Sequence, residues 1–97
     1  MAGFTIDAID DIRLAVDEAA ACLLDYAGDD GTFTLEISPT EGSLELHLSV
    51  DGLSDSWPPV GIESELSWTI LTALSGEVSF ENDGGIPAIR MFKSSGV

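Results

Sequence analysis

The stretch that most constrains the fold covers residues 10–27 and reads D-D-I-R-L-A-V-D-E-A-A-A-C-L-L-D-Y-A. Apolar residues recur in it at steps of three and four, the spacing of one face of an α-helix. We expect the following residues to form its buried stripe: Ile9, Ile12, Val16, Ala20, Leu23, Leu24 and Ala27. Glu18 lies off the centre of this stripe, in mid-helix, where a rigid element could aim its carboxylate into a neighbouring site.

The size and charge of the chain limit its class and its partners. Its 97 residues correspond to one small domain, residues 1–97. Eighteen Asp and Glu against three Lys and Arg give a formal net charge of −15. Nucleic acids and anionic membranes repel such a surface, so we expect neither as a partner and favour a basic protein, with solubility alone as the other explanation of the acidity.

The sequence lacks the features of membrane and secreted proteins, which bears on its cellular location. It contains no apolar run long enough to cross a bilayer, and its start lacks the basic residues of a secretion signal. The single cysteine, Cys22, cannot form an internal disulfide, which is consistent with a reducing compartment. We therefore expect a cytoplasmic protein.

The remaining sequence patterns predict the order of the elements. A helix that begins near residues 5–7 and ends at Gly28 is followed by strands over 32–38 and 43–50, joined by a turn at 39–42. A loop over 51–63 leads to a helix over 64–74 with Ser64 as N-cap, and then to strands over 77–81 and 88–93. This order predicts an α+β fold, a two-layer sandwich with the helices on one face of a mostly antiparallel sheet.

Four residues of the opening helix, Ala15, Val16, Glu18 and Ala19, match the first half of the motif A-V-x-E-A-x-x-N-A-x-x-H-A. This is the N box of the RsbW and SpoIIAB family, anti-sigma factors with the Bergerat, or histidine-kinase-like, ATPase fold. The chain resembles the family along almost its whole length, through the hairpin, the segment W-T-I-L-T-A-L-S-G-E-V-S-F and the final strand A-I-R-M-F-K. The resemblance implies a shortened form of this fold, because family members usually carry a further strand and helix ahead of the N box.

The N box of this chain departs from the family where the chemistry is done. The resemblance implies that Glu18 stands at the position of the general base, and that the magnesium-binding asparagine is replaced by Cys22 and the final histidine by Tyr26. Magnesium requires oxygen ligands, whereas sulfur suits zinc or copper. We expect Glu18 to be a vestigial base and Cys22 a buried structural residue. We expect no metal site, because only His47 is available to accompany the single cysteine.

The other nucleotide-binding segments are altered as well. Asp51 matches the aspartate that reads adenine in the family, but Leu53 and Asp55 stand where the family has glycines. The phosphate-binding lid, G-x-G-L-G-L in the family, corresponds to E-S-E-L-S-W at residues 63–68. The carboxylates of Glu63 and Glu65 would repel phosphate, at about 1 kcal/mol for each charge pair about 4 Å apart in water. We therefore expect that ATP and magnesium are not cofactors.

Three further side chains have open or minor roles. His47 lies on the polar side of the hairpin, where a lone exposed histidine is usually not a ligand. Trp57, ahead of two prolines, is either an anchor for a partner or a residue that pins its loop to the core. Trp68 lies beside the apolar stripe of the second helix, which favours core packing over contact with a partner.

The resemblance implies a regulatory protein that sequesters a sigma factor and is countered by an anti-anti-sigma (STAS) protein. Acidity agrees with this, because sigma factors present basic DNA-binding surfaces. The alternative is an active serine kinase that phosphorylates an anti-anti-sigma factor, with Glu18 as base and Asp51 on adenine. A third possibility is a structural dimer or a non-functional fragment. Without the family's first strand and helix a sheet edge would lie uncovered, which predicts a homodimer.

Overall fold

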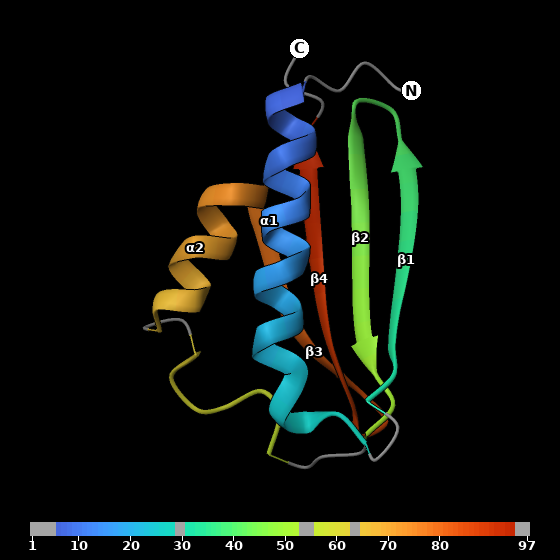
Figure 1. Cartoon of the computed structure of the whole chain (residues 1–97), viewed down its shortest axis with the longest axis vertical. Coiled ribbons are helices and arrows are strands. Elements are labelled where there is room, and N and C mark those ends of the chain that lie inside the picture. Colours follow the sequence, from blue (N-terminus) through green and yellow to red (C-terminus); the bar gives the residue numbers. More distant parts are fainter. Residues whose placement is uncertain (1–5, 29–30, 53–55, 63–64, 95–97) are drawn as a thin grey trace.

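The structure is a computed structural model that describes residues 6–28, 31–52, 56–62 and 65–94. Its elements are, in chain order, α1 (Ile6–Leu23), the 3-10 helix η1 (Leu24–Tyr26), β1 (Phe33–Thr40), β2 (Ser43–Val50), α2 (Leu66–Ser75), β3 (Glu77–Asp83) and β4 (Ile86–Ser94). The strands form one sheet of order β1-β2-β4-β3, in which all neighbours are antiparallel. Both helices lie on the same face of the sheet (Figure 1). The predicted two-layer α+β fold is confirmed.

Glycines with positive φ close both hairpins. Between β1 and β2 the turn is formed by Glu41 and Gly42, with Gly42 at φ 78°. Between β3 and β4 it is formed by Gly84 and Gly85, at φ 63° and 99°, and two successive positive φ angles define a type I′ turn. Such short turns fix the register, which places alternate apolar residues of β2 on the helix side of the sheet.

Helix α1 uses alanine to approach the sheet. Its buried residues are Ala8, Ala15, Ala19 and Leu23. The centre of the predicted stripe was therefore wrong. Of the seven residues expected, Leu23 is fully buried and Leu24 is 61% exposed. The other five are partly buried: Ile9, and, packed against the core, Ile12, Val16, Ala20 and Ala27. Small side chains let α1 lie close over β2 and β4, which turns the larger residues to the flanks of the contact.

Trp57 pins the loop after β2 onto the core. It is 3% exposed, and its indole N–H donates to the carbonyl oxygens of Glu81 at 3.0 Å and Ala88 at 3.3 Å. Its ring stacks on Phe80 and meets Tyr26 edge-on, with centroid separations of 5.3 Å and 4.9 Å. Of the two roles open for Trp57, the structure shows the one in the core.

Trp68 also packs inside the molecule. It is partly buried and meets Phe80 edge-on with a centroid separation of 5.5 Å. The preference for core packing at this position is confirmed.

Several predicted boundaries move by one or two residues, and α1 ends at Leu23 and passes into η1, whereas the helix was predicted to end at Gly28. Strand β1 continues through Pro39, which was expected in a turn; proline is tolerated there because β1 is an edge strand. Helix α2 begins at Leu66 with Glu65 as N-cap, and this cap makes no side-chain hydrogen bond. The predicted cap, Ser64, lies outside the described residues. Strand β2 has the predicted bounds.

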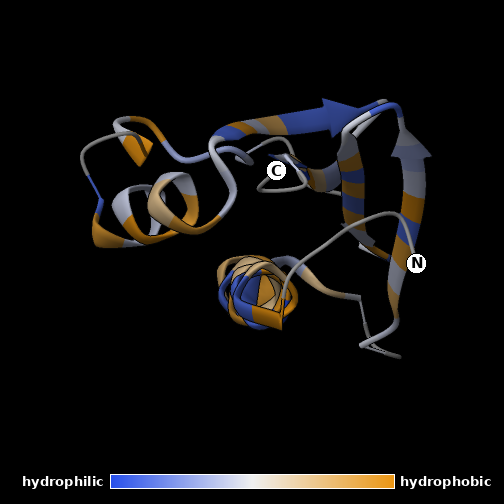
Figure 2. Cartoon of the chain, turned by 90° about the horizontal axis from the view of Figure 1, so that it is seen from above, coloured by the Kyte–Doolittle hydropathy of each residue, from blue (hydrophilic) through white to orange (hydrophobic). Residues whose placement is uncertain are grey.

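The helix layer covers only part of the sheet. Helix α1 packs on β2 and β4, and α2 packs on β3 and β4. Figure 2 shows α1 end-on, with β1 at the sheet edge farthest from α2. Leu35 and Ile37 of β1 therefore remain 40% and 54% exposed, although they share a face with the buried Leu46 and Leu48. In the described part of the chain neither helix has the length and apolar character to cross a membrane.

Two register partners give a test of this partial cover. Leu48→Ala removes a side chain that is 2% exposed, and we expect it to lower the free energy of unfolding by about 2–5 kcal/mol. Leu35→Ala, directly opposite on β1, should cost less than about 1 kcal/mol because Leu35 is already 40% exposed. Urea unfolding followed by circular dichroism measures both changes; equal losses would contradict the partial cover.

Candidate functional site

A pocket of about 260 Å³ lies where the end of α1 and η1, the loop before α2 and the start of α2 meet. It is lined by Ala21, Cys22, Asp25, Tyr26, Trp57, Pro59, Ile62, Glu65 and Ser67. Four of these occupy positions to which the resemblance assigns the nucleotide site: Cys22, Tyr26, Glu65 and Ser67. The fold thus brings the altered N box and the altered lid together. The pocket is smaller than the roughly 300–1,000 Å³ that small-molecule sites usually occupy.

Cys22 faces the first turn of α2. Burial raises the pKa of the Cys22 thiol; a hydrogen bond with the Ser67 side chain opposes this effect, and the negative charge of Glu18 adds to it. The thiol is half-buried and has no disulfide partner. A protonated thiol is a poor nucleophile, and magnesium prefers oxygen ligands to sulfur.

Glu18 lies one helical turn before Cys22 but lines a different hollow. That hollow lies between α1 and α2, where Leu14, Asp17, Glu18, Ile70, Ala73 and Leu74 line it. Glu18 is not among the residues that line the pocket around Cys22. The two N-box residues are therefore electrostatic neighbours without a shared cavity.

Asp51 is tied to the backbone at the end of the first helix. Its Oδ1 accepts a hydrogen bond of 2.8 Å from the Gly28 N–H. The neighbouring Gly52 packs so closely that a Cβ atom there would lie 2.1 Å from the Tyr26 carbonyl oxygen. Asp51 does not line the pocket with Cys22, and the altered positions Leu53 and Asp55 lie outside the described residues.

The charge around the pocket is negative. Asp25 and Glu65 line it and are exposed, whereas none of the chain's three Lys and Arg residues does. Arg90 is on the other face of the sheet, paired with Glu45 and Glu81. The remaining two also lie elsewhere: Lys93 pairs with Asp11 at 3.2 Å, and Arg13 lines a separate hollow on α1. A triphosphate in the pocket would meet two carboxylates and no cation.

The sequence reasoning missed two residues of this region. Ser67, inside the altered lid, makes the side-chain hydrogen bond with Cys22. Gly52 permits the close contact with Tyr26, and a glycine after an aspartate at a strand end was the only signal for it.

Comparison with known proteins confirms the resemblance carried by the N box. The chain is 35% identical over 83 residues to the protein named Anti-sigma-F factor RsbW of Mycobacterium tuberculosis, in the strains CDC 1551 / Oshkosh and ATCC 25618 / H37Rv. The chain is thus similar in sequence to RsbW. The match takes in 86% of it, and the chain spans about half the length, 48%, of the curated relatives it matches. No protein-family model matches the RsbW-like chain. The roles of Glu18, Cys22 and Asp51 stay predictions.

The environment of Cys22 predicts how its single thiol reacts. Because its pKa is raised, less thiolate is present near pH 8 than in the unfolded chain, and alkylation should be slower in the folded protein. Ser67→Ala should slow the reaction further, since it removes the contact that lowers the pKa. Glu18→Gln should speed it up a few-fold, since it removes a charge that raises the pKa.

The measurement is the pH dependence of iodoacetamide modification, read by intact mass. Asp17→Asn, a loss of the same charge at an exposed neighbour of Glu18, serves as the control and should change little. Identical pH profiles for the folded and the urea-unfolded protein would contradict the raised pKa.

Proposed function

We propose that this RsbW-like chain is an anti-sigma regulatory domain, comprising residues 1–97, that acts by binding protein rather than by phosphorylation. The observation that carries the proposal is the pocket at the expected nucleotide position. Cys22 stands in place of the magnesium ligand, and Asp25 and Glu65 line the pocket without a cation. The relatives are named anti-sigma-F factors, which supports a sigma factor as the partner.

The hollow between α1 and α2 is the surface we assign to the partner. Its volume is about 520 Å³, and four of its six lining side chains are apolar: Leu14, Ile70, Ala73 and Leu74. Leu14 is 55% exposed. The carboxylates of Asp17 and Glu18 form the polar part of the lining. An apolar centre beside negative charge suits a partner segment in which apolar side chains alternate with basic ones.

The net charge supports the same class of partner. At −15 the chain attracts basic surfaces over a distance and repels nucleic acid. A sigma factor needs its basic surfaces to bind DNA, so an acidic protein that covers them blocks that binding. In this proposal an anti-anti-sigma protein releases the sigma factor by competing for the chain, and the site of action is the cytoplasm. Glu18 then contributes a surface charge and no longer a catalytic base.

The binding surface is tested by placing a charge in the apolar hollow. We expect Leu14→Asp to weaken binding to the cognate sigma factor by at least about tenfold, because it buries a carboxylate at an apolar contact. Leu24→Asp, the same change at an exposed position outside the hollow, should leave binding unchanged. Biolayer interferometry against the host's sigma factors, produced one at a time, measures both. Failure of every sigma factor to bind would overturn the proposal.

The same experiment carried out with and without Mg-ATP separates the proposal from the kinase alternative. We expect affinities that do not depend on the nucleotide, and no calorimetric heat of Mg-ATP binding up to millimolar concentration. Clear binding, together with phosphorylation of an anti-anti-sigma protein that Glu18→Gln abolishes, would instead establish the kinase with Glu18 as base and Asp51 at the adenine.

We also propose that two copies of the chain associate through β1. This strand is at the sheet edge, and its Leu35 and Ile37 are exposed on the helix side. Antiparallel pairing of two β1 strands about a two-fold axis would join two sheets and bring these apolar side chains together. Pro39 has no N–H, so the pairing would use the part of β1 that precedes it.

Light scattering measures this association directly. The unmodified chain should have the mass of a dimer at high micromolar concentration, and Ile37→Asp should shift it towards the monomer by placing charges at the apolar contact. Thr34→Asp adds the same charge to the opposite face of β1 and should leave more dimer than Ile37→Asp does. A monomeric unmodified chain would contradict the association.

A further inference from the structure

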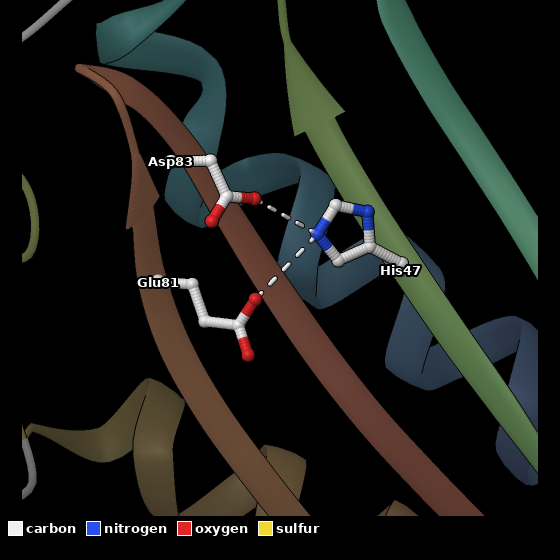
Figure 3. A group of neighbouring side chains, drawn as sticks. All are labelled: His47, Glu81 and Asp83. Carbon is white, nitrogen blue, oxygen red and sulfur yellow. Dashed lines mark ion pairs between the residues drawn. The ribbon is translucent and has the colours of Figure 1, made fainter.

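Three potential metal ligands meet on the sheet face that the helices leave open. They are His47 of β2 and, on β3, Glu81 and Asp83. The His47 Nε2 atom lies 3.7 Å from Glu81 Oε1 and 3.5 Å from Asp83 Oδ2, and one ligand atom from each residue falls within 4.8 Å of the others. Figure 3 shows the imidazole directed towards both carboxylates across β4.

The strand order creates this meeting, although β2 and β3 are not neighbours. Strand β4 lies between them, with Arg90 opposite His47 and Ala88 opposite Glu81. Ala88 has only a methyl group on this face, so the histidine can reach across it towards β3. Ala88 is completely buried, as expected if the longer side chains around it close over the methyl group.

Among the described residues, the His47 Nε2 atom has no hydrogen-bond partner. It is buried as an atom, and no group among the described residues bonds to it. A buried polar atom left in this way costs about 1–3 kcal/mol. Its distances to the two carboxylates are long for hydrogen bonds but close to the separation of two ligands on one zinc ion, about 3.4 Å for tetrahedral bonds of about 2.0–2.2 Å. A metal ion among these three atoms would satisfy Nε2.

The charge of the cluster suits a divalent cation. Arg90 donates from Nε to Glu81 Oε2 at 2.9 Å, and its Nη1 lies 3.0 Å from Glu45 Oε2. The hydrogen bond from Arg90 is the largest cause that lowers the pKa of Glu81, so this carboxylate is ionised at neutral pH. With Asp83, which lies beside His47, this region holds three carboxylates and one guanidinium. With a neutral imidazole, two negative charges remain uncompensated.

Arg90 is also the competitor of a metal in this cluster. Its Nη2 donates to Glu81 Oε1 at 3.3 Å, the same oxygen that faces His47. A metal ion would share this oxygen with the guanidinium or displace Nη2 from it, while the shorter bond from Nε to Oε2 remains. Of the three proposed ligands, Glu81 is therefore shared with Arg90, whereas in the described structure Arg90 does not contact His47 or Asp83.

We propose that His47, Glu81 and Asp83 bind one divalent transition-metal ion on the open face of the sheet. One imidazole and two carboxylates form a ligand set that suits zinc, whereas magnesium and calcium prefer oxygen alone. Water completes the coordination. The ion joins β2 to β3 across β4 and stabilises the folded chain. This site is distinct from the pocket at Cys22, and the proposal does not depend on the anti-sigma function.

Zinc chloride is the probe, and the full chain, treated with chelator and dialysed, is the sample. Isothermal titration at about 0.15 M salt with excess magnesium suppresses weak binding to the acidic surface. We expect one zinc ion per chain and a higher melting temperature. His47→Gln and Asp83→Asn should each weaken binding by at least about tenfold, since even second-shell changes at metal sites typically cost about that much.

Two control variants locate the ion. Glu36→Gln removes a carboxylate from the register partner of His47 that lies outside the cluster, and Cys22→Ser removes the only thiol. Both should bind zinc as the unmodified chain does. Circular dichroism of each metal-free variant checks that it folds. Because His47 is the chain's only histidine, its imidazole nitrogen resonances give an independent readout, and zinc should shift Nε2.

Two results would overturn the proposal. One is the absence of stoichiometric zinc binding, which would leave His47 as a side chain between two carboxylates without a metal. The other is binding that survives His47→Gln or is lost with Cys22→Ser, which would place the zinc elsewhere.

Discussion

The close contact of α1 with the two central strands is the constraint on which the rest of the structure depends. Ala15 and Ala19 of the helix, and Leu46 and Ile89 of the strands, are completely buried. A larger side chain at either alanine would push the helix from the sheet, because the packed core does not yield by a methyl group without strain. The depth at which α1 lies also fixes where Cys22 and η1 stand, and hence the shape of the pocket beside α2.

The sequence could predict those parts of the fold that depend on residues close together along the chain. Strand β2 was located correctly because its apolar residues alternate strictly and turn residues flank both ends. The face of α1 was misplaced because a helix with both alanines and large apolar residues offers two adjacent stripes. The distance between α1 and the sheet decides which of the two stripes packs against the strands. Pro39 likewise belongs to a strand only because β1 is at the edge, which is a property of the sheet order.

The candidate site divides in the same way. Cys22 and Tyr26 lie on consecutive turns at the end of the first helix. The resemblance assigns both of them and the lid to nucleotide binding, so their meeting could be predicted. The hydrogen bond from Gly28 to Asp51 could not, since it joins residues 23 positions apart whose approach depends on the tertiary fold. The position of Glu18 in a different hollow from Cys22 was also beyond sequence, because α2 decides which side of α1 each cavity opens on.

The open face of the sheet shows the same limit most clearly. Read along the chain, His47 is a lone histidine on a hairpin, and the carboxylates of β3 belong to a separate hairpin. Only the order β1-β2-β4-β3 brings them together. Glu81 then connects the two sides of the molecule, because its carbonyl oxygen accepts the indole N–H of Trp57 while its carboxylate meets His47 and Arg90. Trp57 lines the pocket at Cys22, so the Glu81 backbone holds one wall of that pocket through this hydrogen bond. The backbones of β3 and β4, at Glu81 and Ala88, thus connect the pocket on the helix side of the sheet with the cluster on its open face.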